Sequence, residues 1–321
     1  MTFDTHNMAE APWEVVVIGG GTAGLSAALI LARARRRVLV LDSGEPRNRF
    51  APHMHGVLSR DGYSPLQLLA DGRREVRAAD GVIESATVAH VRAVEEGFEI
   101  ETRAGDVVGA GRIIVATGIR DDLPAIEGFA EQWGRGVVMC PFCDGFETRG
   151  TAIAVFASTP TGLHRAHMLR SYSPDVTVYT AGMGEIPAED LSALAARGIR
   201  LDDRTVVRLV TDGGAVTGLE LADGTVAAAD VVFAEPTFVA LDGVLRELGA
   251  EQSETFFGPW TAVDAQGKTS VDRVWAVGSS ANPAALVPIA AASGVVAAVA
   301  VTGELVTEDI RAAVARVGIS A

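Results

Sequence analysis

The chain has 321 residues, of which 48% are hydrophobic, and its 27 Lys and Arg stand against 41 Asp and Glu, a formal net charge of −14. This length predicts about two domains with sizeable cores. The acidic balance argues against nucleic-acid and membrane-surface partners, because both present negative charge. Two cysteines exclude a disulfide framework and a four-thiolate zinc site, but they allow one redox pair.

The N-terminal segment MTFDTHNMAEAPWE has acidic residues and lacks the basic and apolar stretches of a secretory signal, so we expect a cytoplasmic protein. A buried parallel strand is expected from Glu14 to Ile18, where an apolar, β-branched run stops at glycines. A helix from about Ala23 to Arg35 follows, and its terminal arginines favour the negative end of the helix dipole. A second strand, Val38 to Leu41, ends at Asp42 and completes a βαβ unit.

Further strands are expected at Ile113 to Ala116, Ala152 to Phe156, Val176 to Tyr179, Val231 to Ala234 and Val274 to Val277. Their alternation with helical segments predicts an α/β protein, and the two βαβ starts, at Val15 and near Ile153, indicate two Rossmann-like, doubly wound domains. The apolar stretch Ala284 to Val301 is long enough to span a membrane. We expect a buried helix instead, because the stretch is rich in Ala and contains Pro288, Ser293 and Gly294.

A Gly-x-Gly-x-x-Gly motif, Gly19 to Gly24, lies between the first strand and the first helix. The first glycine permits a tight turn, the second lets backbone N–H groups approach a pyrophosphate, and the third lets helix and strand pack closely. Asp42, about 20 residues further on, is placed to bind a ribose. Strand, helix and acid in this register predict dinucleotide binding.

Both cysteines lie in Cys140-Pro-Phe-Cys143-Asp144-Gly. Two intervening residues suit a reversible disulfide in which one thiol has a lowered pKa and attacks as the thiolate. No metal site is expected, because no further Cys and no His partner lies nearby. Asp144 is a candidate acid/base for the outgoing thiol, and a turn or helix cap is its structural alternative.

Gly19 to Gly24, Ala116-Thr117-Gly118, the Cys140 to Gly145 motif and Thr269 to Gly278 resemble low-molecular-weight thioredoxin reductases over nearly the whole chain. The resemblance implies the pyridine nucleotide-disulfide oxidoreductase fold, with an FAD domain at about 1–121 and 247–321, a smaller inserted domain at 122–246, and a homodimer. Cys143 would be the sulfur nearer the flavin, and Cys140 would exchange with substrate. The implied FAD contacts are Gly19, Gly21, Thr22, Ala23, Gly24, Asp42, Ser43, Arg47, Asn48, His55, Val88, Ala116, Thr117, Gly118, Gly278, Ser279, Leu286 and Val287.

The chain departs from the reductases where they bind NADPH. Their second glycine-rich loop corresponds here to Ala157-x-Thr159-x-x-Gly162, and side chains at the first two positions would block a pyrophosphate. The next strand ends in Tyr179-Thr180-Ala181-Gly182, without the arginines that grip a 2′-phosphate. We therefore expect that the NADPH site is lost. Ser279 also replaces the aspartate that reductases usually place against FAD.

The segment Asp42 to Gly62 looks like that of the thioredoxin-reductase-like dithiol oxidases, which close disulfides in natural products of the holomycin, gliotoxin and romidepsin type. That subgroup often has His after the second cysteine, where this chain has Asp144. His53 and His55 in this segment are candidate proton acceptors, since imidazole titrates near neutral pH. Their alternative role is to hydrogen-bond the cofactor or the backbone.

The sequence thus predicts an FAD-dependent oxidase that converts a small-molecule or peptide dithiol to a disulfide and passes the electrons to O2, giving H2O2. Two alternatives stay open. One is a disulfide reductase that uses NAD(P)H or ferredoxin, and the other is a non-enzymatic flavoprotein in which the cysteines act as a redox switch. The sequence does not identify the dithiol.

Overall fold

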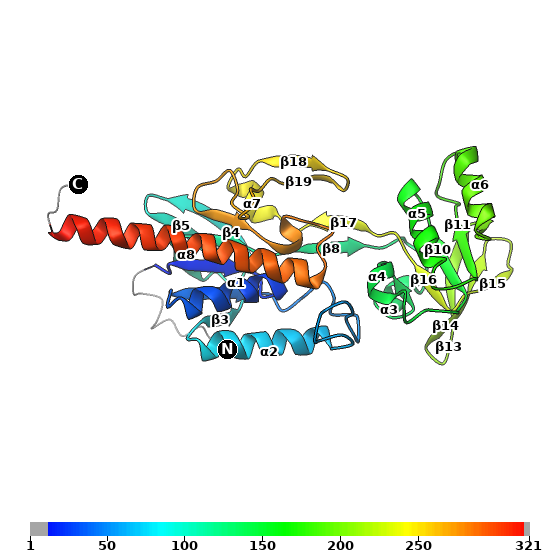
Figure 1. The fold of residues 1–321 in the computed structure, drawn as a ribbon, viewed down its shortest axis with the longest axis horizontal. Coiled ribbons are helices and arrows are strands. Elements are labelled where there is room, and N and C mark those ends of the chain that lie inside the picture. Colours follow the sequence, from blue (N-terminus) through cyan, green and yellow to red (C-terminus); the bar gives the residue numbers. More distant parts are fainter. Residues whose placement is uncertain (1–11, 318–321) are drawn as a thin grey trace. The chain divides into compact units, whose positions relative to one another are not determined.

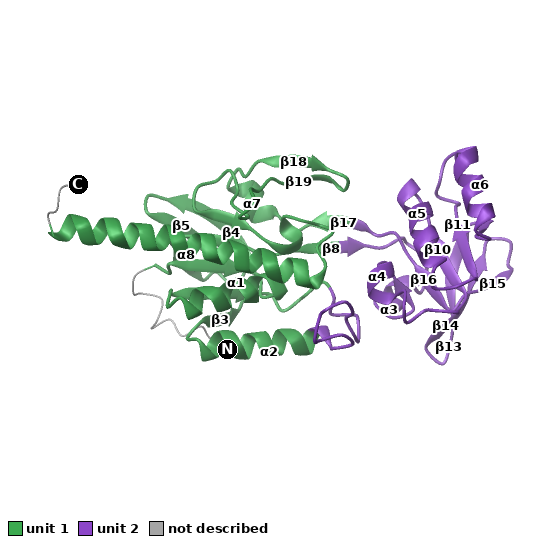
Figure 2. Ribbon diagram, viewed as in Figure 1, with its two compact units in different colours: residues 1–47, 66–120, 238–321 green, residues 48–65, 121–237 purple. Residues whose placement is uncertain are grey.

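A computed structural model describes residues 12–317. Most of the N-terminal segment MTFDTHNMAEAPWE, on which the expectation of a cytoplasmic protein depends, therefore lies outside the described residues. The chain divides into two compact units (Figures 1 and 2). Unit 1 comprises residues 1–47, 66–120 and 238–321, and unit 2 comprises residues 48–65 and 121–237. Two strands, β8 (Ile119–Asp122) and β17 (Thr237–Ala240), pair where the chain passes between the units.

Unit 1 is built on a parallel sheet of β20 (Val274–Ala276), β7 (Ile113–Val115), β1 (Val15–Ile18), β2 (Val38–Asp42) and β3 (Val82–Ser85), in that order. Alternate residues of these strands point to opposite faces. Val15 and Val17 pack with α1 (Thr22–Arg33) and α8 (Val287–Val317). Val16 and Ile18 pack against the antiparallel sheet β4 (Val88–Val94), β5 (Gly97–Thr102) and β6 (Val107–Ala110). Because both faces are covered, the three strands β20, β7 and β1 consist of apolar residues only.

The remaining elements of unit 1 connect these layers. They are α2 (Pro65–Ala78), α7 (Gly243–Glu247), the hairpin β18 (Gln252–Thr255) and β19 (Gly258–Thr261), and the 3-10 turn η2 (Gly278–Ser280). The turn η2 follows β20 directly and precedes α8. It therefore lies at the carboxyl end of the parallel sheet, the edge at which α/β proteins bind their ligands.

Unit 2 repeats the plan around a parallel sheet of β12 (Arg200–Asp202), β11 (Val176–Tyr179), β10 (Ile153–Phe156), β16 (Val231–Phe233) and β9 (Val137–Val138). One face packs on α5 (Pro160–Leu169) and α6 (Ala188–Ala196), and the other on the antiparallel sheet β13 (Val206–Asp212), β14 (Ala215–Leu221) and β15 (Val226–Ala228). Two short helices, α3 (Phe129–Gln132) and α4 (Pro141–Asp144), precede β10. The expectation of two Rossmann-like, doubly wound domains is confirmed.

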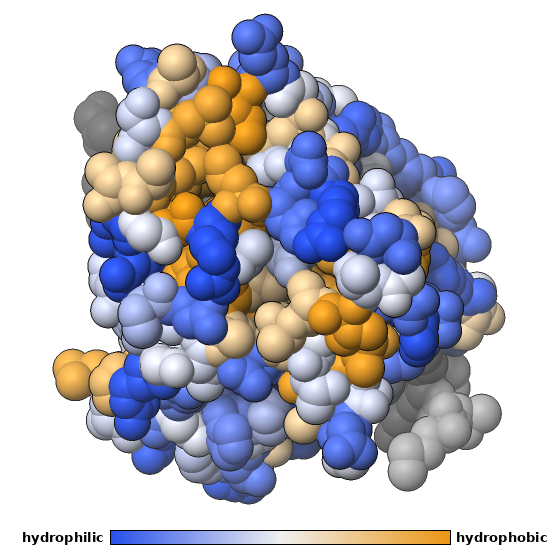
Figure 3. All heavy atoms as spheres, turned by 90° about the vertical axis from the view of Figure 1, so that its right-hand side faces the viewer, coloured by the Kyte–Doolittle hydropathy of each residue, from blue (hydrophilic) through white to orange (hydrophobic). Residues whose placement is uncertain are grey.

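The face of unit 2 that is turned to the viewer in Figure 3 mixes charged side chains with separate hydrophobic patches. Leu191, Leu201, Val207 and Val226 are the exposed large aliphatic residues of α6, β12, β13 and β15. Scattered apolar side chains of this kind are ordinary on a protein surface.

The unit boundaries differ from the expected 121/122 and 246/247. Residues 238–246 belong to unit 1, because Val244 and Leu245 of α7 are buried in the core that lies under β4 and β5. Residues 48–65, expected in the FAD domain, belong to unit 2. Local sequence pattern does not show which core a short segment joins.

The apolar C-terminal stretch forms α8, a 31-residue helix that is long and apolar enough to cross a membrane by length and composition. It lies along α1 in Figure 1, and a Cβ on Gly294 would collide with the carbonyl oxygen of Ala23, so this close approach requires glycine. The prediction of a buried helix holds for one face, formed by Ala297, Ala298 and Val301. The opposite face is exposed, and 28% of the apolar window is buried.

Candidate active site

The glycine motif of unit 1 forms a tight loop between β1 and α1. Gly19 has φ +108°, and a Cβ there would collide with the carbonyl oxygen of Ala116, while a Cβ on Gly24 would collide with that of Gly19. Gly21 has an ordinary φ of −74°, and a Cβ there would meet no atom of the described residues within 4 Å, so the space above it is open. Gly21 is also the N-cap of α1, and as a glycine it has no side chain to cap the helix. The loop therefore offers backbone N–H groups to an anion, which fits the pyrophosphate of FAD.

Asp42, at the end of β2, holds this loop in place. Its Oδ1 accepts a hydrogen bond from the Gly20 N–H at 3.0 Å, and its Oδ2 pairs with Arg73 of α2 at 2.5 Å. A carboxylate has about four acceptor positions, so two remain for the ribose hydroxyls expected there. Arg73 lies 31 residues from Asp42, and nothing in the sequence of its helix marks it as the partner of that carboxylate.

The other predicted cofactor residues of unit 1 gather around η2. The Ser280 Oγ accepts a hydrogen bond from the Gly118 N–H at 2.8 Å and lies 3.2 Å from the Thr117 Oγ1. Gly278 has φ +63°, and a Cβ there would stand 2.8 Å from that of Ala23 at the start of α1. The structure thus brings Thr117, Gly118, Gly278 and Ala23 together, and it adds the fully buried Ser280, which sequence reasoning missed.

A surface hollow of about 250 Å³ lies beyond the end of β2, lined by Ser43, Ser85, Ala86, Thr87, Thr102, Arg103 and Ala104. It contains Ser43, which the sequence predicts to contact FAD, and Thr87, which precedes the predicted residue Val88. Arg47 lies over the ring of Phe238, and Leu286 and Val287 stand at the start of α8. Asn48 and His55 fall in unit 2, and their contact with FAD stays a prediction.

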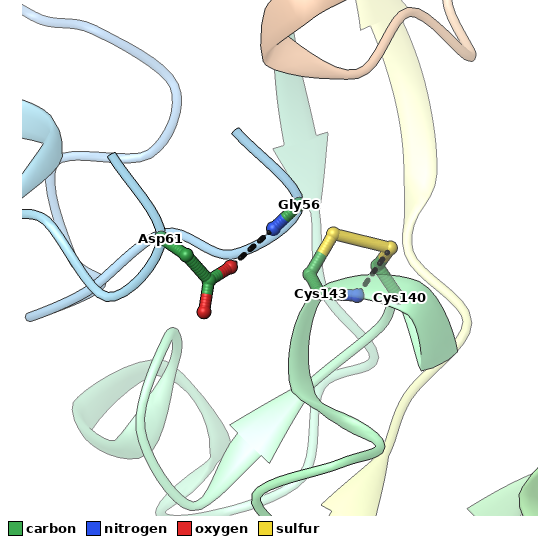
Figure 4. Close-up of a disulfide and its surroundings, with 4 residues drawn as sticks. All are labelled: Gly56, Asp61, Cys140 and Cys143. Atoms are coloured by element: carbon green, nitrogen blue, oxygen red, sulfur yellow. Dashed lines mark hydrogen bonds between the residues drawn. A yellow bond between two sulfur atoms is a disulfide. The ribbon is translucent and has the colours of Figure 1, made fainter. Parts of the chain in front are cut away.

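Cys140 and Cys143 form a disulfide in unit 2, with their Cα atoms 5.2 Å apart (Figure 4). Cys140 is the N-cap of α4, and its sulfur accepts a hydrogen bond from the Cys143 N–H at 3.2 Å. Pro141 at the first turn has the fixed φ that favours a helix start. Phe142 and Phe146 are 67% and 62% exposed, so large apolar side chains stand in the open beside the disulfide.

Asp144 follows Cys143 at the end of α4. Burial raises the pKa of Asp144 to about 6, the charge of Glu147 adds to the rise, and His55 opposes it. A carboxyl with this pKa holds and releases a proton close to neutral pH, as an acid/base catalyst requires.

The two candidate histidines have different surroundings. The His55 Nδ1 lies 3.4 Å from the Asp61 Oδ2 and 3.6 Å from the Glu147 Oε1. The His53 Nδ1 lies 3.0 Å from the carbonyl oxygen of Gly62. His55 therefore shares with Asp144 the charged neighbour Glu147, a residue that the sequence analysis did not single out.

The second loop of unit 2 carries Ala157 and Thr159 where the reductases have glycines. The carboxylate of Glu235 accepts hydrogen bonds from the Ser158 N–H at 2.8 Å, from the Ser158 hydroxyl at 2.8 Å and from the Thr159 hydroxyl at 2.6 Å. Pro160 stands in the first turn of α5, so one helix N-terminal position lacks an N–H. The Glu235 carboxylate thus occupies one backbone N–H and two hydroxyl groups at the start of this loop.

A model of the family described as pyridine nucleotide-disulphide oxidoreductase matches residues 13–294. The chain belongs to this family. It is 32% identical over 311 residues to thioredoxin reductase tcpT of Claviceps purpurea, and the alignment covers 91% of this chain and 93% of the relative. It is 29% identical to thioredoxin reductase sirT of Leptosphaeria maculans, over 95% of this chain and 98% of the relative.

Among solved structures, HlmI superposes with a TM-score of 0.91 and 40% identity, over 97% of this chain and 99% of that chain. An oxidoreductase from Agrobacterium tumefaciens gives a TM-score of 0.86 and 34% identity, over 92% and 99%. The resemblance to thioredoxin reductases and the pyridine nucleotide-disulfide oxidoreductase fold are confirmed. The chain is a thioredoxin-reductase-like, flavin-dependent oxidoreductase with a cysteine pair.

Proposed function

We propose that this chain oxidises a substrate dithiol to a disulfide, and that the electrons pass from the cysteine pair through FAD to O2. The observation that carries the proposal is the Glu235 carboxylate on the second loop. A carboxylate at this place repels the negative charge of a pyrophosphate and already accepts hydrogen bonds from the loop, so unit 2 does not fit NADPH. An intact flavin loop and disulfide without a nicotinamide site suit a dithiol, rather than NADPH, as the electron donor.

The steps balance as thiol–disulfide exchange followed by electron transfer. A substrate thiolate attacks the Cys140 sulfur, the Cys140–Cys143 bond breaks, and Cys143 leaves as a thiolate. The second substrate thiol loses its proton and attacks the mixed disulfide, which releases the substrate disulfide and leaves both cysteines reduced. FAD, when bound, accepts the two electrons that re-form the cysteine disulfide and passes them to O2, giving H2O2.

Residues of this chain supply binding and proton transfer. The Cys143 N–H, which donates to the Cys140 sulfur, stabilises the Cys140 thiolate in the reduced pair. Asp144 gives its proton to the leaving Cys143 thiolate and takes the proton of the second substrate thiol. Phe142 and Phe146 offer apolar contact surface to a small-molecule or peptide dithiol.

The test is an anaerobic comparison of electron donors. The FAD-loaded protein is mixed with dithiothreitol and, separately, with NADPH, and the flavin absorbance is followed. We expect bleaching by dithiothreitol alone, loss of this bleaching in Cys140→Ser, and repeated peroxide release after air is admitted. Bleaching by NADPH but not by the dithiol would refute the proposal and favour a disulfide reductase. A single turnover without continued peroxide release would also refute it, and would favour a redox switch.

We also propose that the chain forms a homodimer through the exposed face of α8. Val299, Val306, Ile310, Val314 and Val317 are 40–66% exposed and recur at intervals of three, four and seven residues, which aligns them along one side of the helix. A two-fold related copy presents the same stripe, so the apolar side chains of one copy would pack against those of the other and leave water. Light scattering should give a dimer for the parent and a monomer for Val306→Glu/Ile310→Glu. A dimer that survives the double substitution would contradict this interface.

A further inference from the structure

The segment after the cysteine pair continues α4 as a tight helical run, with the disulfide at its start (Figure 4). The N–H groups of Asp144, Gly145 and Thr148 donate to the carbonyl oxygens four residues earlier, at 3.1, 2.9 and 3.2 Å, which are bonds of the α-helical type. A Cβ on Gly145 would collide with the ring of Tyr172, so the run packs closely against another part of unit 2. The segment therefore has a defined shape, and its side chains keep their places relative to the disulfide.

Three side chains lie on one side of this segment. Phe142, Phe146 and Arg149 follow one another at intervals of four and three residues, the spacing that brings side chains together on a helical run. All three are exposed. At a helical rise of about 1.5 Å per residue, the backbone from Cys143 to Arg149 spans about 9 Å. A small molecule that reacts at the disulfide can therefore reach the long side chain of Arg149.

The Arg149 guanidinium is held in place by the residue beside it. Its Cζ lies 4.1 Å from the centre of the Phe146 ring, and its Nη1 donates to the Phe146 carbonyl oxygen at 2.6 Å. A guanidinium has five N–H donors and stays positively charged in proteins. No carboxylate of residues 12–317 pairs with Arg149, so most of its donors have no partner in this part of the chain.

The acid nearest to Arg149 in sequence has a different neighbour. The Glu147 Oε1 lies 3.6 Å from the His55 Nδ1, and the spacing of two residues turns Glu147 away from the side that carries Phe146 and Arg149. The chain as a whole carries a net charge of −14, which repels anions. A fixed cation beside the disulfide gives this part of the surface a local attraction for an anionic substrate.

We propose that Arg149 binds a carboxylate of the substrate, while Phe142 and Phe146 contact its apolar part. The chain then prefers apolar dithiols that carry a carboxylate over neutral dithiols of the same shape. A planar guanidinium suits this task, because it can donate two parallel hydrogen bonds to one carboxylate while it stacks on an aromatic ring. This inference rests on the proposed dithiol oxidation, since it names the class of dithiol that the cysteine pair takes.

The experiment compares dihydrolipoate with its neutral amide, dihydrolipoamide, two dithiols that differ in one charge. Their dissociation constants are measured by NMR shift titration of the FAD-bound Cys140→Ser/Cys143→Ser protein, which cannot exchange thiols with them. Serine is also a good N-cap, so α4 is kept. The quantity of interest is the dissociation constant of the amide divided by that of the acid.

We expect this ratio to fall about two- to fivefold when Arg149→Gln is added, the range of an exposed ion pair. Arg149→Glu should lower it further, because repulsion replaces attraction. Arg197→Gln is the matched control. The Arg197 guanidinium of unit 2 also donates to a backbone carbonyl, that of His167 at 2.5 Å, but it stands at the end of α6 rather than beside the cysteines.

A merely structural role for Arg149 would change both dissociation constants alike and leave their ratio as it is. An unchanged ratio in Arg149→Gln, or an equal fall in Arg197→Gln, would overturn the inference. Added salt should lower the ratio of the protein that keeps Arg149, because it screens an exposed pair of charges, and a ratio insensitive to salt would also count against carboxylate binding.

Oxidation of the two dithiols by the parent protein separates this inference from the proposed function. The binding measurement needs no turnover. A ratio that depends on Arg149 without oxidation of either dithiol would refute the proposed function alone. Oxidation of both dithiols with a ratio that does not depend on Arg149 would refute this inference alone.

Discussion

The charge state of Asp144 gives a prediction about stability that is independent of turnover. In the folded chain the pKa of Asp144 is about 6, against 3.8 for the unperturbed side chain, and the largest cause is burial. At about 1.4 kcal/mol for each tenfold difference in proton affinity, ionising Asp144 costs about 3 kcal/mol more in the folded chain than in the unfolded one. Native Asp144 should therefore destabilise unit 2 at neutral pH.

The sign follows from the direction of the shift. Well below pH 3.8 the carboxyl is protonated in both states and contributes nothing, and the penalty develops as the pH rises from there to the folded pKa of about 6. Asp144→Asn removes the penalty, so it should raise the free energy of unfolding at neutral pH by up to about 3 kcal/mol. The same substitution should lower dithiol turnover, because the amide cannot exchange the proton.

Urea unfolding of the oxidised, FAD-bound protein at several pH values measures this effect. The gain of Asp144→Asn over the parent should be largest near neutral pH and should shrink toward zero at about pH 3. Glu131→Gln, which replaces an exposed carboxylate of α3, is the control and should show little gain at any pH. A loss of stability in Asp144→Asn at neutral pH, or a gain that does not depend on pH, would refute the reasoning.

Three further predictions concern the cofactor and the substrate. Gly21→Val should leave the protein folded but free of flavin by absorbance, because its Cβ enters open space above the loop; a flavin-loaded Gly21→Val would contradict the assignment. Cys140→Ser and Cys143→Ser should each abolish turnover and keep the yellow colour, since both cysteines lie in unit 2 and the flavin loop lies in unit 1; a colourless variant would argue against this division. Phe142→Ala should raise the KM for an apolar dithiol several-fold with little change in kcat, and an unchanged KM in steady-state assays would exclude Phe142 from substrate binding.

Much of the fold could be predicted because its signals are local. A β-branched run that ends in glycines, followed by a helix, predicted β1, its loop and α1, although the helix ends at Arg33 rather than Arg35. The pair Cys140 and Cys143 could be interpreted as a disulfide from spacing alone. The domain boundaries could not be predicted in this way, because Leu245 joins the core of unit 1 through contacts with residues far away in sequence.

The sequence by itself determined that this chain has two nucleotide-binding-type domains, one intact glycine loop and one redox pair, since each depends on residues within a few positions of one another. Only the tertiary structure decided which side chains act on these motifs. Glu235 reaches Ser158 across 77 positions, Arg73 reaches Asp42 across 31, and His55 approaches Glu147 from another segment. Glu235 and Ser158 meet because β16 and β10 are parallel and end at the same edge of the sheet. The other two pairs join a strand end to a helix and a loop to a turn, and no local periodicity records such contacts.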